Sequence, residues 1–128
     1  MSTRKERKYL IDTDVLINQL KAGSNKLSAV VNETEYIYIS VINEYELFRG
    51  IHNENQIAAL EKSLSFFGRI QISSEIAKKA ADYARDKNII NSLGLADILI
   101  AATCNIHGLV LVTENIKHFR MIPDIIIY

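Results

Sequence analysis

Acidic side chains stand beside apolar runs at three distant points of the sequence. Asp12 directly follows the run Tyr9–Ile11, Glu46 comes shortly after a second apolar run, and Asp97 lies inside a third. A carboxylate placed among apolar residues is costly unless it is paired or bound to a cation. If the fold gathers these three acids, they offer the oxygen ligands that Mg²⁺ prefers. Their types and placement therefore indicate the cutting or transfer of phosphoryl groups.

The elements that must position these acids are short apolar runs that alternate with helical patterns. The runs are mostly continuous rather than alternating, which is typical of strands buried on both faces of a parallel sheet. They cover residues 9–11, 36–39, 70–72, 109–112 and 125–127. Apolar residues recur at helical spacing within 57–67, 76–84 and 95–106. This order predicts an α/β fold with a central parallel sheet flanked by α-helices, and a loop over 87–93.

Local signals mark the ends of two of these helices and part of the core. Ser73 or Ser74 is suited to cap the start of the helix over 76–84, and Gly108 to end the helix before it. Cys104 falls on the apolar face of the last long helix, so we expect it in the core rather than as a nucleophile. Four aromatic residues are likewise expected to pack inside: Tyr36, Tyr38, Phe66 and Phe67.

Length and composition set the class of protein. The 128 residues suit one domain, residues 1–128, and 48% hydrophobic residues can form a core without disulfides. The formal net charge is zero, so a strongly basic nucleic-acid binder is not indicated. No apolar stretch reaches the ~20 residues of a membrane span, and a single cysteine favours a cytoplasmic setting. The basic start of the chain, from Arg4 to Lys8, is expected to be a loose solvated tail.

Each candidate acid also has an ordinary structural interpretation. Asp12 ends a strand, where open α/β sheets bind ligands, whereas Asp14 could share its face or simply favour the start of the next helix. Glu44 and Glu46 flank the same apolar helical stripe on opposite sides, so the helical wheel does not choose between them. Asp97 falls in the first turn of a very apolar helix.

Polar and basic residues near these acids are further candidates. Thr113 and Asn115 follow the fourth strand and could bind water or phosphate, or serve as turn and cap residues. Arg49, near Glu46, and the cluster of Lys117, His118 and Arg120 could contact phosphates or remain surface charges. The three histidines show no zinc-binding spacing.

Four segments resemble, in order, the motifs of PIN-domain ribonucleases. They are YLIDTDVLI at 9–17, ISVINEYELFRG at 39–50, GLADILIAA at 94–102 and LVTENIKHF at 111–119. The second motif carries a Glu-Leu pair before a Gly, and this match selects Glu46 over Glu44.

The resemblance implies a PIN-like fold and an endoribonuclease that depends on Mg²⁺ or Mn²⁺. It implies catalytic roles for Asp12, Glu46, Asp97 and Asn115, with the cation held by Asp12 and Asp97. Asp14 and Thr113 would support them, while Arg49, Lys117 and Arg120 would contact RNA. Water would attack phosphorus in line and leave 5′-phosphate and 3′-hydroxyl ends. Many relatives carry Asp where this chain has Asn115, and a neutral amide is a poorer cation ligand.

The short length resembles the VapC group of toxin–antitoxin systems, which implies a homodimer, a cognate antitoxin protein and an RNA substrate. Two other interpretations stay open at this point. The opening DTDVL at 12–16 also fits haloacid-dehalogenase-like phosphatases, with Asp12 as nucleophile and Asp14 as general acid. Asn115 also leaves room for a catalytically weak module that binds RNA or protein.

Overall fold

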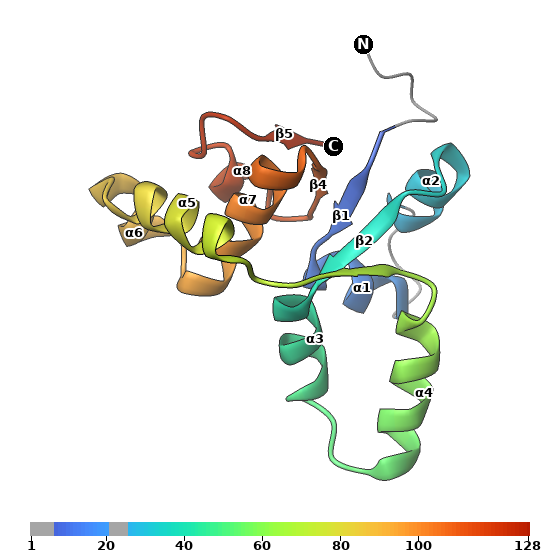
Figure 1. Ribbon diagram of the computed structural model, residues 1–128. Helices are drawn as coiled ribbons and strands as arrows, with labels where there is room; N and C mark the ends of the chain where they lie inside the picture. The colour runs from blue at the N-terminus through green and yellow to red at the C-terminus, as the bar shows by residue number, and fades with distance from the viewer. Residues whose placement is uncertain (1–6, 21–25) are drawn as a thin grey trace.

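A five-stranded parallel sheet forms the centre of the molecule (Figure 1). The computed structural model describes residues 7–20 and 26–128, so Arg4, Lys5 and the rest of residues 1–6 lie outside it. The strands are β1 (Tyr9–Ile11), β2 (Ile37–Ser40), β3 (Gly68–Ile70), β4 (Val110–Val112) and β5 (Ile126–Ile127). Their order is β3-β2-β1-β4-β5, with every neighbouring pair parallel. The predicted α/β class and parallel sheet are therefore confirmed.

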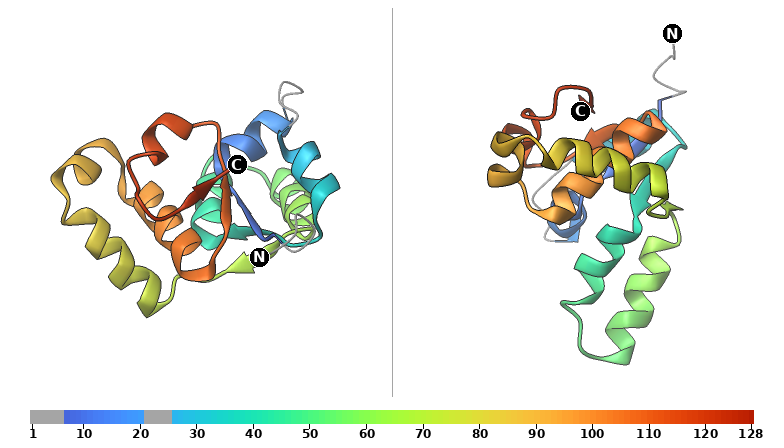
Figure 2. Two further views of the ribbon diagram at one scale, coloured as in Figure 1. Left: turned by 90° about the horizontal axis from the view of Figure 1, so that it is seen from above. Right: turned by 60° about the vertical axis from the view of Figure 1, so that its left-hand side comes forward.

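Helices cover both faces of this sheet (Figures 1 and 2). Side chains alternate along a strand, so Leu10 and Leu111 join a core with α5 (Ser74–Ala84) and α7 (Leu95–His107), whereas Tyr9 and Val112 join a core with α1 (Thr13–Leu20) and α2 (Lys26–Glu33). The helices are α1 (Thr13–Leu20), α2 (Lys26–Glu33), α3 (Val41–Phe48), α4 (Glu54–Leu64), α5 (Ser74–Ala84), α6 (Lys87–Ser92), α7 (Leu95–His107) and α8 (Ile116–Phe119). None of the helices in the part of the chain that is described has the length and apolar character to cross a membrane.

The helix ends follow the predicted signals. The hydroxyl of Ser73 accepts a hydrogen bond from the backbone N–H of Ile76, so Ser73 is the N-cap of α5. Gly108 ends α7 with φ of 64°, in the left-handed region that favours glycine. Cys104 is buried in the core, as expected.

The third strand begins two residues earlier than predicted, at Gly68 instead of Ile70. Gly68 pairs with Tyr38 across the sheet, and a Cβ at this position would lie only 2.5 Å from Cδ1 of the Tyr38 ring. The missing side chain thus makes room for the aromatic ring over β3. A glycine at a strand start carries no apolar signal, which is why sequence periodicity placed the strand later.

Two predictions about local structure are wrong. Residues 87–93, predicted as a loop, contain α6, which Asp86 caps and which buries Ile89. Ile89 is the buried residue of this six-residue helix, and one buried position is too weak a pattern to predict so short a helix. Tyr36 and Phe66, predicted to be core residues, expose 46% and 63% of their surface. Both lie just outside a strand or helix, where burial is not imposed by the sheet or helix face.

Candidate active site

The carboxyl ends of β1, β2 and β4 meet at one edge of the sheet, because parallel strands in register end together. Ile11 pairs with Val112, so the next residues, Asp12 and Thr113, emerge side by side. The backbone N–H of Asp12 donates to the carbonyl of Val112 at 2.9 Å and extends the pairing by one residue. The edge thus brings together residues that are 101 positions apart in the chain.

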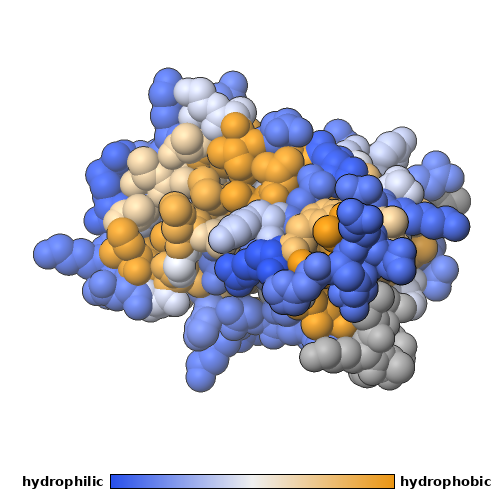
Figure 3. Space-filling model, turned by 90° about the horizontal axis from the view of Figure 1, so that it is seen from below, coloured by the Kyte–Doolittle hydropathy of each residue, from blue (hydrophilic) through white to orange (hydrophobic). Residues whose placement is uncertain are grey.

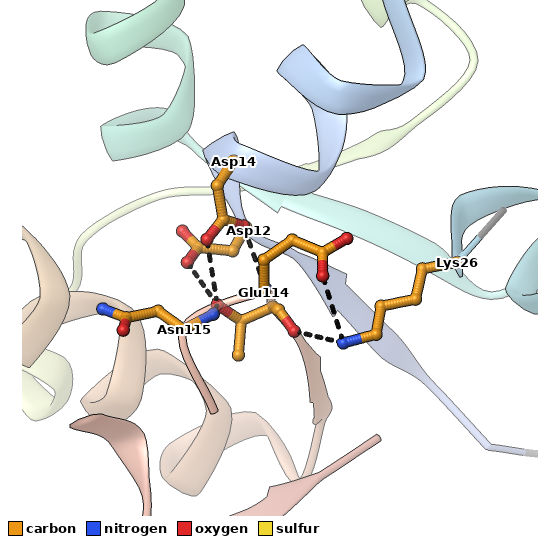
Figure 4. Close-up of polar contacts among 6 residues, drawn as sticks. Asp12, Asp14, Lys26, Glu114 and Asn115 are labelled. Carbon is orange, nitrogen blue, oxygen red and sulfur yellow. Dashed lines mark hydrogen bonds and ion pairs between the residues drawn. The ribbon is translucent and has the colours of Figure 1, made fainter. Parts of the chain in front are cut away.

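Asp12 is held by two hydrogen bonds at this edge, and Figure 4 draws the one from Thr113. Its Oδ1 accepts from the backbone N–H of Thr13 at 2.9 Å, and its Oδ2 accepts from the hydroxyl of Thr113 at 2.8 Å. Asp14, in the first turn of α1, accepts from the backbone N–H of Glu114 at 3.2 Å, and its Oδ2 lies 3.4 Å from the Thr113 hydroxyl. The turn after β4 therefore binds both aspartates.

Glu46 reaches the same edge through the hydroxyl of Thr13, which donates to its Oε1 at 2.8 Å. That hydroxyl in turn accepts from Nδ2 of Asn43 at 3.0 Å, and Asn43 is fully buried. Asn43 also accepts from the backbone N–H of Ser40 and closes the capping box that begins α3. The fold thus separates the two glutamates, because Glu44 instead forms an ion pair with Arg69 at 3.4 Å.

Asp97 completes the group from the first turn of α7, as the sequence predicted. Burial raises the pKa of its carboxyl, and the negative charges of Glu46 and Asp14 raise it further. The charge of His118 acts in the opposite direction and lowers that pKa. Asp97 therefore lies close enough to interact electrostatically with Asp14 of α1, Glu46 of α3 and His118 of α8.

Asp12 shows the strongest electrostatic effect in the group. Burial, the nearby charge of Asp14 and, more weakly, that of Asp97 raise its pKa to about 7, although the Thr113 and Thr13 hydrogen bonds oppose the shift. Burial also raises the pKa of Asp14. Shifts of this kind, produced by burial and like charges at the open end of a sheet, are characteristic of functional sites. A divalent cation relieves this repulsion when it binds.

The donor set fits a hard divalent cation. Asp12, Asp14, Glu46 and Asp97 offer only oxygen ligands, which Mg²⁺ and Mn²⁺ prefer to nitrogen or sulfur. Within residues 7–20 and 26–128, no three Asp, Glu, His or Cys side chains are grouped so that they alone could hold a metal ion. Mg²⁺ does not require one, because one or two carboxylates with water and substrate phosphate normally hold it.

The remaining predicted residues lie around this group with different degrees of contact. Asn115 is the N-cap of α8, and its backbone N–H donates to the Thr113 hydroxyl at 3.0 Å. Its side-chain amide points away from Lys26 (Figure 4). Lys117 and Arg120 are exposed on and just after α8. Arg49 is exposed at the end of α3, with its guanidinium 5.5 Å from the centre of the Tyr45 ring.

The structure adds three residues that sequence reasoning missed. Thr13 and Asn43 hold Glu46, and the ammonium group of Lys26 donates to the carbonyl oxygen of Thr113 at 2.7 Å. Thr13 could have been suspected, because it lies between two candidate acids. Nothing near Lys26 in the sequence indicates a contact with a residue 87 positions away.

The raised pKa of Asp12 predicts how stability depends on pH when no divalent cation is present. Between pH 4 and about 7 the native state keeps a proton on Asp12 that the unfolded chain has released, so native stability falls as pH rises across this window. In EDTA, Asp12→Asn should therefore raise the free energy of unfolding, by about 2 kcal/mol at pH 8 and by less at pH 5. Urea denaturation at several pH values measures the difference.

Asp124→Asn is the matched control, because hydrogen bonds from Lys79 and Tyr83 lower the pKa of Asp124 instead. That carboxylate stabilises the native state above the unfolded pKa and loses this effect only as pH falls through the native one. Asp124→Asn should thus destabilise the protein by a similar amount at pH 5 and pH 8. A pH-independent effect of Asp12→Asn would contradict the electrostatic description of the site.

Known proteins with this sequence pattern and fold are ribonucleases and toxin–antitoxin proteins. Ribonuclease VapC19 of Mycobacterium tuberculosis is 32% identical over 120 residues, which is 91% of this chain and 95% of the relative. Ribonuclease VapC10 of the same organism is 33% identical over 91% of this chain and 89% of its own length.

Solved structures give the same result. A toxin-antitoxin complex from Klebsiella pneumoniae matches with a TM-score of 0.76 and 31% identity over 93% of this chain and 96% of that one. The DNA-bound VapBC from Salmonella typhimurium matches with a TM-score of 0.83 and 26% identity over 95% and 97%. The PIN domain family itself matches residues 9–123. On this evidence the chain belongs to the PIN domain family.

Proposed function

We propose that this chain is a metal-dependent endoribonuclease of the VapC type, the toxin of a toxin–antitoxin pair. The observation that carries the proposal is the convergence of Asp12, Glu46 and Asp97 on the carboxyl edge of the sheet, where their charges interact. Relatives that cover nearly the whole chain are named ribonucleases, and metal dependence is general among PIN-domain ribonucleases. We further propose that residues 1–128 act as one functional unit in the cytoplasm.

Asp12 and Asp97 are the residues that would hold Mg²⁺ or Mn²⁺. When bound, such a cation neutralises charge on the scissile phosphate and lowers the pKa of a coordinated water. Thr113 keeps Asp12 oriented through its hydroxyl, and the Glu114 amide does the same for Asp14. Both aspartates therefore need little rearrangement before substrate binds, which lowers the cost of assembling the site.

We propose that Glu46 orients the attacking water, since the Thr13 hydroxyl binds one of its carboxylate oxygens, Oε1, and Oε2 can accept from water. The water oxygen forms a bond to phosphorus in line with the departing 3′ oxygen, and the phosphorus–O3′ bond breaks. The water proton passes to a carboxylate at the edge, and the 3′ oxygen takes up a proton to become the 3′-hydroxyl. The other product carries the 5′-phosphate.

Asn115 sets a limit on this arrangement. An amide oxygen is a weaker cation ligand than a carboxylate and cannot bridge two cations as a carboxylate can. We therefore propose that Asn115 contacts water or phosphate, and that any second cation arrives with the substrate.

The two glutamates of α3 supply a matched test of catalysis. Glu46→Gln should lower kcat for RNA cleavage by at least about 100-fold, because it removes a charge from the acid group. Glu44→Gln changes the same helix by the same chemistry but only breaks an ion pair with Arg69, so its kcat should remain within about threefold of wild type. Cleavage of end-labelled RNA in Mg²⁺, with EDTA as a blank, measures both.

Equal loss in both variants would show that α3 is needed for folding rather than Glu46 for chemistry. Full activity of Glu46→Gln, or of wild type in EDTA, would contradict the proposed mechanism. RNA binding without any cleavage in Mg²⁺ or Mn²⁺ would favour the non-catalytic interpretation. The family assignment favours a nuclease over the phosphatase interpretation, and inertness toward a chromogenic phosphomonoester would support that choice.

Lys117 and Arg120 are proposed to bind RNA phosphates beside the acid group, since α8 follows directly from Asn115. The double variant Lys117→Gln/Arg120→Gln should weaken RNA binding most at low salt and flatten the salt dependence, by about 0.7 in slope for each lost phosphate contact. Fluorescence anisotropy in EDTA measures this without cleavage. Lys78→Gln, which removes an exposed lysine from α5, should leave the slope unchanged. A salt-independent loss of affinity would instead indicate misfolding.

We propose that Arg49 also binds an RNA phosphate. The variant Arg49→Gln, measured in the same anisotropy assay, tests this proposal.

The proposed partners are an antitoxin protein and a second copy of the chain. Figure 3 shows apolar side chains gathered over one half of the face that is seen from below. On α7 and α6, Leu95 and Ile90 expose 73% and 49% of their surface. Apolar residues gathered in this way mark an interaction surface. Light scattering of the purified chain should show a dimer. The double variant Leu95→Glu/Ile90→Glu should be a monomer.

Expression of the chain in a bacterial host should arrest growth. A small protein from a neighbouring gene that relieves this arrest when it is co-expressed would be the antitoxin.

A further inference from the structure

Lys26 joins a distant helix to the turn that organises the two aspartates. It is the first residue of α2, and its Nζ donates to the carbonyl oxygen of Thr113 at 2.7 Å and lies 3.6 Å from Oε2 of Glu114 (Figure 4). These two contacts connect Lys26 to the 113–115 turn, and through this turn Lys26 can act on the site.

This turn is where both aspartates obtain hydrogen-bond donors. The Thr113 side chain donates to Asp12, and the Glu114 backbone N–H donates to Asp14. The bond from Lys26 fixes the Thr113 carbonyl, which belongs to the same peptide group as the N–H that donates to Asp14. A charged donor forms a stronger bond than a neutral one, so the orientation of this peptide depends on Lys26.

Lys26 also positions the negatively charged carboxylate of Glu114. The charge of Glu114 raises the pKa of Asp14, so the two carboxylates are close enough to repel each other. The ion pair with Lys26 draws the Glu114 carboxylate to the α2 side of the turn (Figure 4). Glu114 is thereby kept from replacing the carboxylate that Asn115 lacks.

The helix that carries Lys26 is itself anchored at its other end. Glu33, in the last turn of α2, accepts hydrogen bonds from the hydroxyls of Tyr9 at 2.7 Å and Tyr128 at 3.1 Å. Thr34 then donates to the backbone carbonyl of Arg7 at 2.9 Å. With one end of α2 bound to β1 and to the residue that follows β5, the ammonium group at the other end has a defined position.

We infer that Lys26 is a positioning residue that orients the Thr113–Glu114 turn and so sets the divalent-cation affinity of the Asp12–Asp14 edge. The inference rests on the proposed metal-dependent ribonuclease function and names a residue outside the four motifs. Lys26 acts mainly through the bond to the Thr113 carbonyl, since the ion pair with Glu114 is longer and partly exposed.

Three variants separate the possible roles. Lys26→Met keeps the length of the side chain but removes the donor, Lys26→Arg restores a charged donor, and Glu114→Gln breaks the ion pair while leaving the carbonyl bond. Two measurements are made on each full-length variant. One is the rise in Tm with increasing Mn²⁺ or Mg²⁺, which reports metal binding without any turnover. The other is kcat and KM for RNA cleavage as a function of Mg²⁺.

For Lys26→Met we expect the half-saturating metal concentration to rise about 10-fold and kcat at low Mg²⁺ to fall comparably, as for other residues that orient metal ligands. KM for RNA should stay within about twofold, because phosphate contacts are untouched. Lys26→Arg should recover most of the metal affinity, and Glu114→Gln should change it by less than about threefold.

An unchanged metal midpoint in Lys26→Met would overturn the inference, whatever happens to activity. So would a metal-free Tm that falls in both Lys26→Met and Lys26→Arg without a change in metal binding, because that result assigns Lys26 a purely structural role. If Glu114→Gln alone reproduces Lys26→Met, the ion pair rather than the carbonyl bond is responsible and the stated route is wrong. If wild type binds metal but cuts no RNA, the ribonuclease proposal fails while the metal titrations still decide the role of Lys26.

Discussion

Repulsion between carboxylates at the carboxyl edge of the sheet is the constraint that the rest of this structure accommodates. The edge collects acids from α1, α3 and α7 because parallel strands end together and their following helices start there. Burial and like charge then raise the pKa of Asp12 to about 7, so the metal-free site stores unfavourable electrostatic free energy. A cation that neutralises the acids releases that energy. Affinity for metal and reduced stability without metal thus have one physical origin.

Two threonine hydroxyls allow the edge to keep these charges in fixed positions. Thr13 donates to Glu46 and accepts from Asn43, whereas Thr113 donates to Asp12 and accepts from the Asn115 backbone. A hydroxyl can donate only one proton, and an N–H bound at its oxygen leaves that proton directed at the acid. Each acid is therefore held by a neutral group, which orients the carboxylate without neutralising it and leaves its charge available to a cation.

The sequence was sufficient to predict the features that depend on local pattern. Continuous apolar runs indicated the parallel strands, Gly108 marked a helix end that needs a positive φ, and a polar residue in the apolar start of α7 singled out Asp97. The choice between Glu44 and Glu46 was beyond periodicity, because both flank one stripe. It depends on tertiary partners, Arg69 for one and Thr13 for the other. Lys26 was missed for the same reason, since its partner lies 87 positions away in the sequence.

The negative charge of the carboxylates at the edge gives a physical reason for an uncharged amide at position 115. Asp12 and Asp14 have raised pKa values, and the Glu114 carboxylate beside them is already paired with Lys26. Another carboxylate on the same turn would lie next to Thr113 and add to the repulsion. Asn115 keeps the backbone N–H that fixes the Thr113 hydroxyl but brings no charge. The edge therefore retains its geometry with fewer negative groups, and under the proposed function this arrangement would suit one cation better than two.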